Sequence, residues 1–154
     1  MLAPAVSAQQ LVEGCLSLMT EEILEKKCDP NNPCLFCKDA RGVSLNNELA
    51  YSARDSYAVS PGHTLVVPRR HVASFFELTP EEINACMGLI NEERKLLDKE
   101  FKPDGYNIGV NIGPAAGQSI LHVHIHIIPR YQGDVENPQG GVRHVIPRKG
   151  HYKR

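Results

Sequence analysis

The sequence lacks any long apolar run. No stretch approaches the roughly 20 apolar residues that a membrane-spanning helix needs, and the first ten residues, MLAPAVSAQQ, contain neither a basic segment nor the apolar core of an export signal. The formal net charge is only −1, so overall charge favours neither a nucleic-acid polymer nor an anionic membrane as partner. These absences predict a soluble, cytoplasmic protein without a membrane or nucleic-acid polymer as partner.

A disulfide framework is also not expected. The chain has five cysteines, an odd number, and without an export signal these are better interpreted as thiols or metal ligands. No internal repeat or low-complexity segment interrupts the 154 residues, a length that suits one domain with a core of its own.

The first third of the chain predicts a helix, a loop and two strands. Residues 7–27 have apolar side chains at helical spacing and predict an N-terminal helix outside the main domain. Residues 28–42, CDPNNPCLFCKDARG, predict a loop, because proline and asparagine oppose regular structure. Residues 48–68 predict an antiparallel pair of strands separated by turn chemistry at residues 60–62, with the second strand over 64–67.

The clearest helix lies within residues 78–101. Thr79 caps it, Pro80 is at its first helical position, and Glu82 completes a capping box. Its expected buried stripe consists of Ile83, Met87, Ile90, Leu97 and Phe101. Cys15 and Cys86, on apolar helix faces, are expected to be core residues.

Two further strands within residues 106–130 are joined by a glycine-rich turn, and the remaining residues have little periodicity. The element order predicts an α+β fold with a mainly antiparallel sheet covered by helices. The expected organisation is an N-terminal helical extension (1–30), one domain (31–132) and an extended C-terminal tail (133–154).

The segment HVHIHIIPR places histidine at every second position, as His122, His124 and His126. Residues two apart share a face of a β-strand, and the β-branched residues between them favour a strand, so the three imidazoles should project together. A solvent-exposed strand face would mix lysine, threonine, glutamate and serine. Histidine alone instead indicates proton transfer, nucleophilic attack or metal ligation.

The turn GPAAGQS comes directly before these histidines. Gly113 and Gly117, with small alanines between them, would let backbone N–H groups approach an anion, and Gln118 and Ser119 add polar side chains. Such a turn alone is often only a turn. Beside three aligned imidazoles it favours a phosphate site.

Cys34 and Cys37, in CLFC, have the two-residue spacing of a zinc knuckle. By themselves they are half of a site, because two more ligands must come from elsewhere. A redox-active pair is the alternative, but the sequence around them has no thioredoxin-like βαβ pattern.

The combination of GQSILHVHIHIIPR with the upstream SPGHTLVVPRRH resembles the histidine triad (HIT) superfamily of nucleotide hydrolases and transferases, from about residue 33 to 130. The resemblance implies that His124 attacks the α-phosphorus of a nucleotide, forming a covalent nucleotidyl-histidine that water hydrolyses. It further implies that His126 and Gln118 hydrogen-bond the phosphoryl oxygens and that Ser119 lies near the leaving group. The nucleotide-binding residues that it implies are Asp55, His63, Asn111 and Gly117.

The same resemblance implies a closed, structural zinc site, with His71 and His122 completing the pair Cys34 and Cys37. It also implies a HIT-like fold and a homodimer. The turn GPAAGQS favours a purine dinucleoside polyphosphate, such as a diadenosine compound, as substrate. Asp55 favours the alternative, an adenosine 5′-phosphoramidate. Three further alternatives stay open: phosphorolysis in place of hydrolysis, a non-catalytic nucleotide-binding or zinc scaffold protein, and a catalytic metal held by all three strand histidines.

Overall fold

The structure, a computed structural model, describes residues 34–38 and 42–152. The helix expected over residues 7–27, together with Cys15 and Cys28, lies outside the described residues. The described elements, in chain order, are α2 (Leu35–Lys38), β1 (Val43–Asn46), β2 (Ala50–Arg54), β3 (Thr64–Pro68), the 3-10 helix η1 (Phe75–Glu77), α3 (Pro80–Glu100), β4 (Gly105–Val110), the 3-10 helix η2 (Pro114–Ala116), β5 (Ile125–Arg130) and the 3-10 helix η3 (Gly141–Val145).

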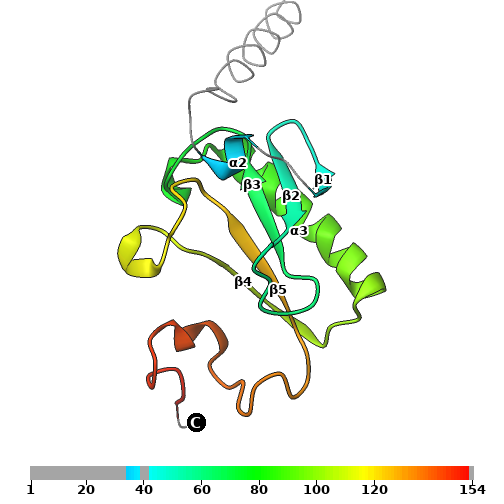
Figure 1. Cartoon of the computed structure of the whole chain (residues 1–154), viewed down its shortest axis with the longest axis vertical. Helices are drawn as coiled ribbons and strands as arrows, with labels where there is room; N and C mark the ends of the chain where they lie inside the picture. The colour runs from blue at the N-terminus through cyan, green and yellow to red at the C-terminus, as the bar shows by residue number, and fades with distance from the viewer. Residues whose placement is uncertain (1–33, 39–41, 153–154) are drawn as a thin grey trace, which may run out of the picture.

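The five strands form one antiparallel sheet in the order β1-β2-β3-β5-β4. Helix α3 covers one face of this sheet, over β1, β2 and β3, and the short helix α2 lies near one end of β3 (Figure 1). This arrangement confirms the predicted α+β class with a mainly antiparallel sheet. Because β3 and β5 are antiparallel, the segment that follows β3 and the segment that precedes β5 meet at one end of the pair, where His71 and His122 lie together.

Helix α3 begins as its sequence predicts. The Thr79 hydroxyl accepts a hydrogen bond from the Glu82 N–H at 3.3 Å, and the Glu82 carboxylate accepts one from the Thr79 N–H at 2.9 Å. The predicted stripe is only partly correct, because Met87 is 47 % exposed whereas its neighbour Cys86 is fully buried. One residue turns a helix by about 100°, so the buried face runs through Cys86, Ile90 and Leu97 and leaves Met87 outside it.

A buried carboxylate at the interface of α3 with the sheet was not predicted. Glu93 has no exposed surface, and it accepts hydrogen bonds from the Ser52 hydroxyl at 2.6 Å and from Arg54 at 3.0 Å. Buried charges are tolerated when they are paired and hydrogen-bonded. The two partners lie on β2, so helix periodicity alone gives no sign that Glu93 turns inward.

Two short elements lie where the sequence predicted a loop or nothing at all. Helix α2 falls inside the expected loop of residues 28–42, and β1 follows it without having been predicted. Tertiary contacts account for both elements: the Leu45 N–H of β1 donates to the Ser52 hydroxyl at 3.0 Å, and the Tyr51 hydroxyl donates to the Phe36 carbonyl of α2 at 2.9 Å. Elements of four residues have too little local preference to be recognised without such partners.

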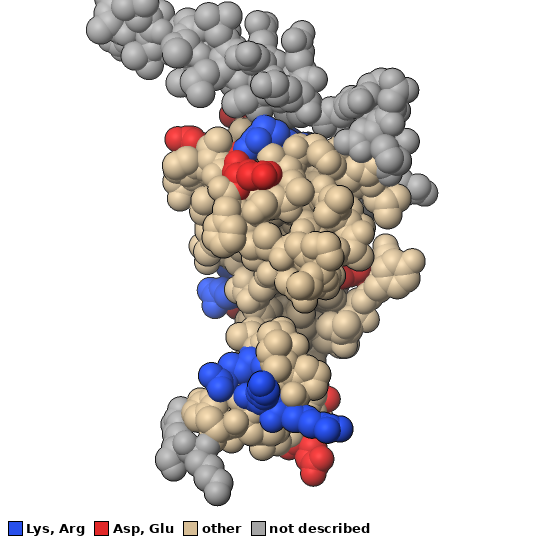
Figure 2. Space-filling model, turned by 90° about the vertical axis from the view of Figure 1, so that its left-hand side faces the viewer, with Lys and Arg blue, Asp and Glu red and all other residues tan. Residues whose placement is uncertain are grey.

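The C-terminal segment contains the 3-10 helix η3, which the expectation of an extended tail did not include. It lies below the sheet in Figure 1, on the side where β4 starts and β5 ends, and it contacts β4. Figure 2 shows lysine and arginine side chains gathered at this end of the molecule.

Over the described ranges, no helix combines the length and the apolar character that crossing a membrane requires.

Candidate active site and metal centre

The three histidines do not all lie in one strand. Strand β5 begins at Ile125, so His122 and His124 precede it and only His126 lies within it. The pairing of β5 with β3 ends at Val66 opposite Ile125, and the next backbone contact is the Val123 N–H donating to the Val72 carbonyl at 2.8 Å. The strand ladder therefore does not reach His122 or His124, but the rings still follow one another, since Phe36 packs on both His122 and His124 and His124 packs on His126.

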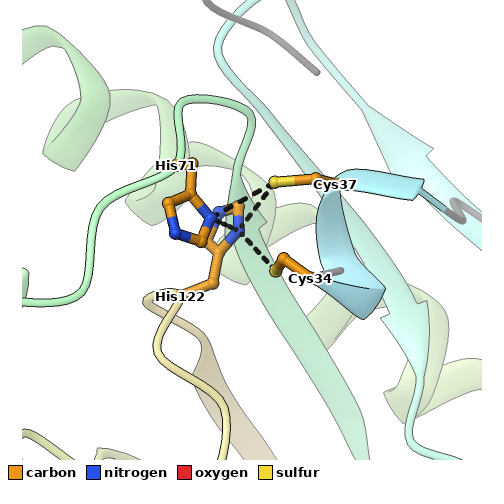
Figure 3. Close-up of side chains that lie close together, drawn as sticks. All are labelled: Cys34, Cys37, His71 and His122. Atoms are coloured by element: carbon orange, nitrogen blue, oxygen red, sulfur yellow. Dashed lines mark hydrogen bonds between the residues drawn. The ribbon is translucent and has the colours of Figure 1, made fainter. Parts of the chain in front are cut away.

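His122 belongs to a cluster with Cys34, Cys37 and His71. Cys37 comes from α2 and Cys34 directly precedes it, whereas His71 comes from the loop after β3 and His122 from the loop before β5. The four side chains point toward one another (Figure 3). Their potential ligand atoms all lie within 4.8 Å of one another. Three segments that are far apart in the sequence therefore converge on one point.

The spacing of these atoms fits a tetrahedral zinc ion. Bonds of about 2.05 Å to nitrogen and about 2.3 Å to sulfur separate two nitrogens by about 3.3 Å and a nitrogen from a sulfur by about 3.6 Å. The Nδ1 atoms of His71 and His122 are 3.3 Å apart, and His122 Nδ1 lies 3.5 Å from each of the two sulfur atoms. His71 Nδ1 is 3.3 Å from Cys37 Sγ.

Hydrogen bonding prepares His122 for this role. Its Nε2–H donates to the Pro68 carbonyl at 2.8 Å, so the lone pair of the neutral ring is on Nδ1 and faces the cluster. Such outer hydrogen bonds fix the tautomer of a metal-ligating histidine. Burial, opposed by the bond to Pro68, lowers the pKa of His122 to about 4, which keeps the ring in the neutral form that binds a metal.

His124 is buried, with 6 % of its surface exposed, and its Nδ1–H donates to the backbone carbonyl of His122 at 2.8 Å. The lone pair of the neutral ring is therefore on Nε2. A neutral imidazole with one nitrogen held in this way offers the other as a nucleophile or base. The ring of His126 meets that of His124 edge to face, with centroids 5.1 Å apart.

A second cluster lies on the other side of His124. His126 Nδ1 is 3.0 Å from Nε2 of His63, and His63 Nδ1 receives the Val59 N–H at 3.3 Å. The Asp55 carboxylate is 3.5 Å from the same Nδ1. With Nδ1 of His63 acting as an acceptor, its Nε2–H donates to His126, and this leaves the hydrogen of His126 on Nε2.

The imidazoles of this second cluster are held neutral. Burial lowers the pKa of His63 against the opposing charge of Asp55. Burial also lowers the pKa of His126, and repulsion by His124 and His63 adds to the effect. The result is a neutral hydrogen-bond donor, His126, beside the ring of His124.

The glycine-rich turn closes on itself. Gly113 and Gly117 adopt φ values of 80° and 85°, and the N–H groups of Ala116, Gly117 and Gln118 all donate to carbonyls within the turn. The Gln118 side chain is buried and ties the turn together, accepting from the Gly113 N–H at 2.8 Å and donating to the Ala73 carbonyl at 2.7 Å. In this conformation these N–H groups face the turn and not an anion.

Two of the other residues singled out in the sequence lie in the segment that joins β4 to β5. Ser119 is exposed and follows the turn directly, and Asn111 comes just after the end of β4. An open cavity of about 380 Å³ lies beside Asp55 and His63. Asp55 accepts the Tyr57 N–H at 2.8 Å, which fixes one carboxylate oxygen at the rim of this cavity.

Phe36 and Tyr51 were missed by the sequence analysis. The Phe36 ring packs against both His124 and His122, with centroid distances of 5.1 and 5.9 Å. The Tyr51 hydroxyl holds the Phe36 carbonyl. The position of Phe36 between two cysteines with metal-ligand spacing was the available signal, but nothing in the sequence shows which ring it covers.

The chain belongs to the HIT family. The family model described as HIT domain matches residues 40–133, more than half of the chain. A crystal structure of a HIT family protein from Bacillus anthracis superimposes with a TM-score of 0.64 at 29 % identity, covering 80 % of this chain and 81 % of that one.

Relatives with curated names agree with this membership. A 16.1 kDa HIT-like protein of Mycoplasma pneumoniae is 33 % identical, covering 71 % of this chain and 80 % of its own. The AP-4-A phosphorylase of Mycobacterium tuberculosis is 34 % identical, over 60 % of this chain and 48 % of its own. Adenylylsulfatase HINT3 of Arabidopsis thaliana is 35 % identical, over 67 % of this chain and 55 % of its own. The chain thus spans about half the length of these two enzymes.

Proposed function

We propose that this chain is a nucleotide hydrolase or nucleotidyltransferase that acts at the α-phosphate of a purine nucleotide derivative through a covalent adduct on His124. The carrying observation is the hydrogen bond from His124 Nδ1–H to the His122 carbonyl. It leaves the lone pair on Nε2, in a buried site next to His126. A neutral imidazole with its second nitrogen engaged is an activated nucleophile.

In the first step, His124 Nε2 forms a bond to the α-phosphorus while the bond from phosphorus to the leaving group breaks. The ring, now bonded to phosphorus, becomes cationic, and the His122 carbonyl, which already accepts the Nδ1–H, stabilises that charge. His126 Nε2–H is placed to donate to a phosphoryl oxygen, where negative charge shifts in the transition state. Water then attacks the phosphorus, gives up a proton and releases neutral His124.

Gln118 contributes by holding the turn that precedes the histidines, since both ends of its amide are engaged there. A polyphosphate leaving group departs as an anion, whereas an amine must gain a proton. Ser119, exposed and next to Gln118, is the proposed proton relay for an amine. Asn111 and Gly117 complete the phosphate surroundings, and Asp55 at its cavity is the proposed contact of the ribose hydroxyls.

A dinucleoside polyphosphate such as a diadenosine compound is the first proposed substrate. The similarity to AP-4-A phosphorylase supports a dinucleoside tetraphosphate substrate, with inorganic phosphate as an alternative acceptor to water. The similarity to adenylylsulfatase HINT3 and the acid Asp55 support the alternative, an adenosine 5′-phosphoramidate or a related adenylyl compound. The two proposals differ in the leaving group and share the His124 adduct.

Three structural proposals accompany the activity. Zinc held by Cys34, Cys37, His71 and His122 is a structural ion, because four protein ligands leave no position for substrate. A homodimer is proposed on the grounds that β4 is an edge strand whose Ile108 is 48 % exposed. The catalytic unit is proposed to be residues 31–132, with 1–30 and 133–154 as additions to it.

Intact-mass spectrometry after rapid mixing tests the activity. We expect the parent protein to gain transiently the mass of one adenylyl group from diadenosine triphosphate or from adenosine phosphoramidate. His124→Asn should gain none, and His144→Asn, in the C-terminal segment, should behave as the parent. Substrate consumption at the parental rate by His124→Asn would show that the nucleophile is misassigned. Nucleotide binding without any adduct in the parent would instead favour a non-catalytic binding protein.

A further inference from the structure

The proposed metal centre and the proposed nucleophile are joined by two short paths. The first path is His122 itself. Its ring is fixed at both nitrogens, with Nδ1 in the cluster and Nε2 on the Pro68 carbonyl. Its backbone carbonyl is the acceptor that holds Nδ1–H of His124 at 2.8 Å. An interaction that fixes the His122 ring therefore also restrains the His122 carbonyl oxygen, and this oxygen selects the Nδ1–H tautomer of His124.

The second path is Phe36. This residue lies between the two cysteines in α2, and its ring packs on the ring of His124, with centroids 5.1 Å apart and planes inclined by 52°. Its carbonyl accepts the Tyr51 hydroxyl. The orientation of one face of His124 therefore depends on where α2 sits.

Helix α2 has four residues, which is too short to be stable by its own hydrogen bonds. It is held by the two cysteines in the cluster, by the packing of Phe36 and by the hydrogen bond from Tyr51. The main hydrophobic core, between α3 and the sheet, includes no residue of α2 and none of the four cluster residues. Phe36 packs instead on the smaller cluster of Tyr51, Leu65 and Val67, so release of the metal-binding residues would loosen α2 while leaving the main core in place.

We propose that the metal centre positions the nucleophile: metal bound by Cys34, Cys37, His71 and His122 clamps α2 and His122, and Phe36 transmits this clamp to the ring of His124. Phe36 is thus a positioning residue, and it does not touch the reacting phosphorus. The catalytic consequence rests on the proposed function. The structural part, the ordering of His124 by metal, does not depend on it.

The structural part is tested by nitrogen NMR of the protein with ¹⁵N-labelled histidine. In zinc-loaded protein, His124 should show a protonated Nδ1 and an unprotonated Nε2 as two separate resonances, assigned by their absence in His124→Asn. After removal of zinc with a chelator, the two resonances should move toward one averaged position, and they should return when zinc is added back. Identical His124 resonances with and without zinc would overturn the clamp.

Phe36→Leu tests the transmission without removing metal, and so it also covers the case in which zinc-free protein unfolds. Leu35→Ala is the matched control, because Leu35 lies in the same turn and is 64 % exposed. Both variants should bind one zinc ion per chain. Phe36→Leu should show averaged His124 resonances and an adduct formation rate lower by about 10- to 100-fold, the scale expected for a displaced catalytic group. Leu35→Ala should stay within about twofold of the parent, the scatter expected of a surface substitution.

Two outcomes distinguish a failure of the metal clamp from a failure of the proposed function. If zinc-loaded Phe36→Leu keeps the parental His124 resonances and the parental adduct rate, Phe36 is not a positioning residue and the proposal is wrong. If the parent forms no adduct while its His124 resonances respond to zinc, the clamp stands and the proposed function fails.

Discussion

Two histidine clusters flank His124, and they differ in how their nitrogen atoms are directed. In the cluster of Cys34, Cys37, His71 and His122, the donor atoms converge on one point at tetrahedral spacing. In the cluster of Asp55, His63 and His126, the potential ligand atoms also lie within 4.8 Å of one another. There, however, each ring passes a hydrogen bond to the next, from Val59 through His63 to His126.

The comparison shows that two clusters of equal compactness can direct their nitrogen atoms in different ways. A convergent set of lone pairs with thiolates suits zinc. A serial set, in which each nitrogen is donor or acceptor to its neighbour, suits the placement of a proton. Two histidines lie on each side of His124, and the residues that accompany them decide the chemistry.

The largest expected effect is on the serial side. His126→Ala removes the proposed donor to the phosphoryl oxygen, so adduct formation should slow by about 10²- to 10³-fold, the usual cost of losing one such donor. Its zinc content should stay at one per chain. Stopped-flow substrate turnover together with metal analysis measures both quantities. Loss of zinc in this variant would show that the two clusters are not separate.

On the convergent side, Cys37→Ser should abolish stoichiometric zinc binding, because serine replaces a soft thiolate ligand. Zinc at 100 times its Kd stabilises a folded protein by about 3 kcal/mol, so added zinc should raise the Tm of the parent and not that of the variant. Cys86→Ala is the control: this cysteine is buried against the sheet, and the variant should lose stability yet keep its zinc. An equal zinc-dependent rise in Tm for Cys37→Ser would remove Cys37 from the ligand set.

The cluster of Asp55, His63 and His126 should also make the stability of the folded protein depend on pH. The pKa values of His63 and His126 are lowered in the folded protein from 6.5. The unfolded chain therefore binds more protons below about pH 6.5, and stability present above that pH is lost as the pH falls toward the lowered pKa values. Urea denaturation at pH 7.5 and 5.5 should show this loss. His63→Gln removes one titrating group and the repulsion that this group exerts on His126. The variant should therefore lose less stability than the parent between pH 7.5 and 5.5, and an equal loss would show that His63 is not a source of the pH dependence.

The smallest expected effect concerns the loop that presents His71. Arg70 donates to both carboxylate oxygens of Glu82, at 2.8 and 2.7 Å, and anchors this loop to α3. Because Arg70 is 27 % exposed, Arg70→Met should lower the free energy of unfolding by about 1 kcal/mol. The exposed pair of Arg94 and Asp98 provides the control. Arg94→Met should change the free energy of unfolding by less than about 0.5 kcal/mol. Urea denaturation at neutral pH compares the two variants.

This effect has its own pH signature. Burial alone would raise the pKa of Glu82, but hydrogen bonds from Arg70 and from the Thr79 N–H lower it. The stabilisation is therefore present above the ordinary carboxyl pKa of about 4.5 and is lost as the pH falls through the lowered value in the folded protein. Arg70→Met should have less of this acid-dependent loss, and a parental acid dependence would show that Arg70 is not its source.

Much of the fold was predictable, because its signals are local. The capping box of Thr79 and Glu82 and the turn at residues 60–62 identify α3 and the pair of β2 and β3. The four residues expected around zinc do lie together, although only the family resemblance had linked His71 and His122 to the cysteines. Met87, Glu93 and β1 were missed, because each depends on which residues of another element face it.

The sequence by itself determined which side chains are available: alternating histidines, a cysteine pair with knuckle spacing and a helix with its own start signal. Only the tertiary structure decided how they are used. A period of two places side chains on one face only while a strand continues, and the place where β5 begins depends on its pairing with β3. In the folded chain His122 contacts the cysteines, His126 contacts His63, and Phe36 packs against His124, and each of these contacts joins segments that are far apart in the sequence.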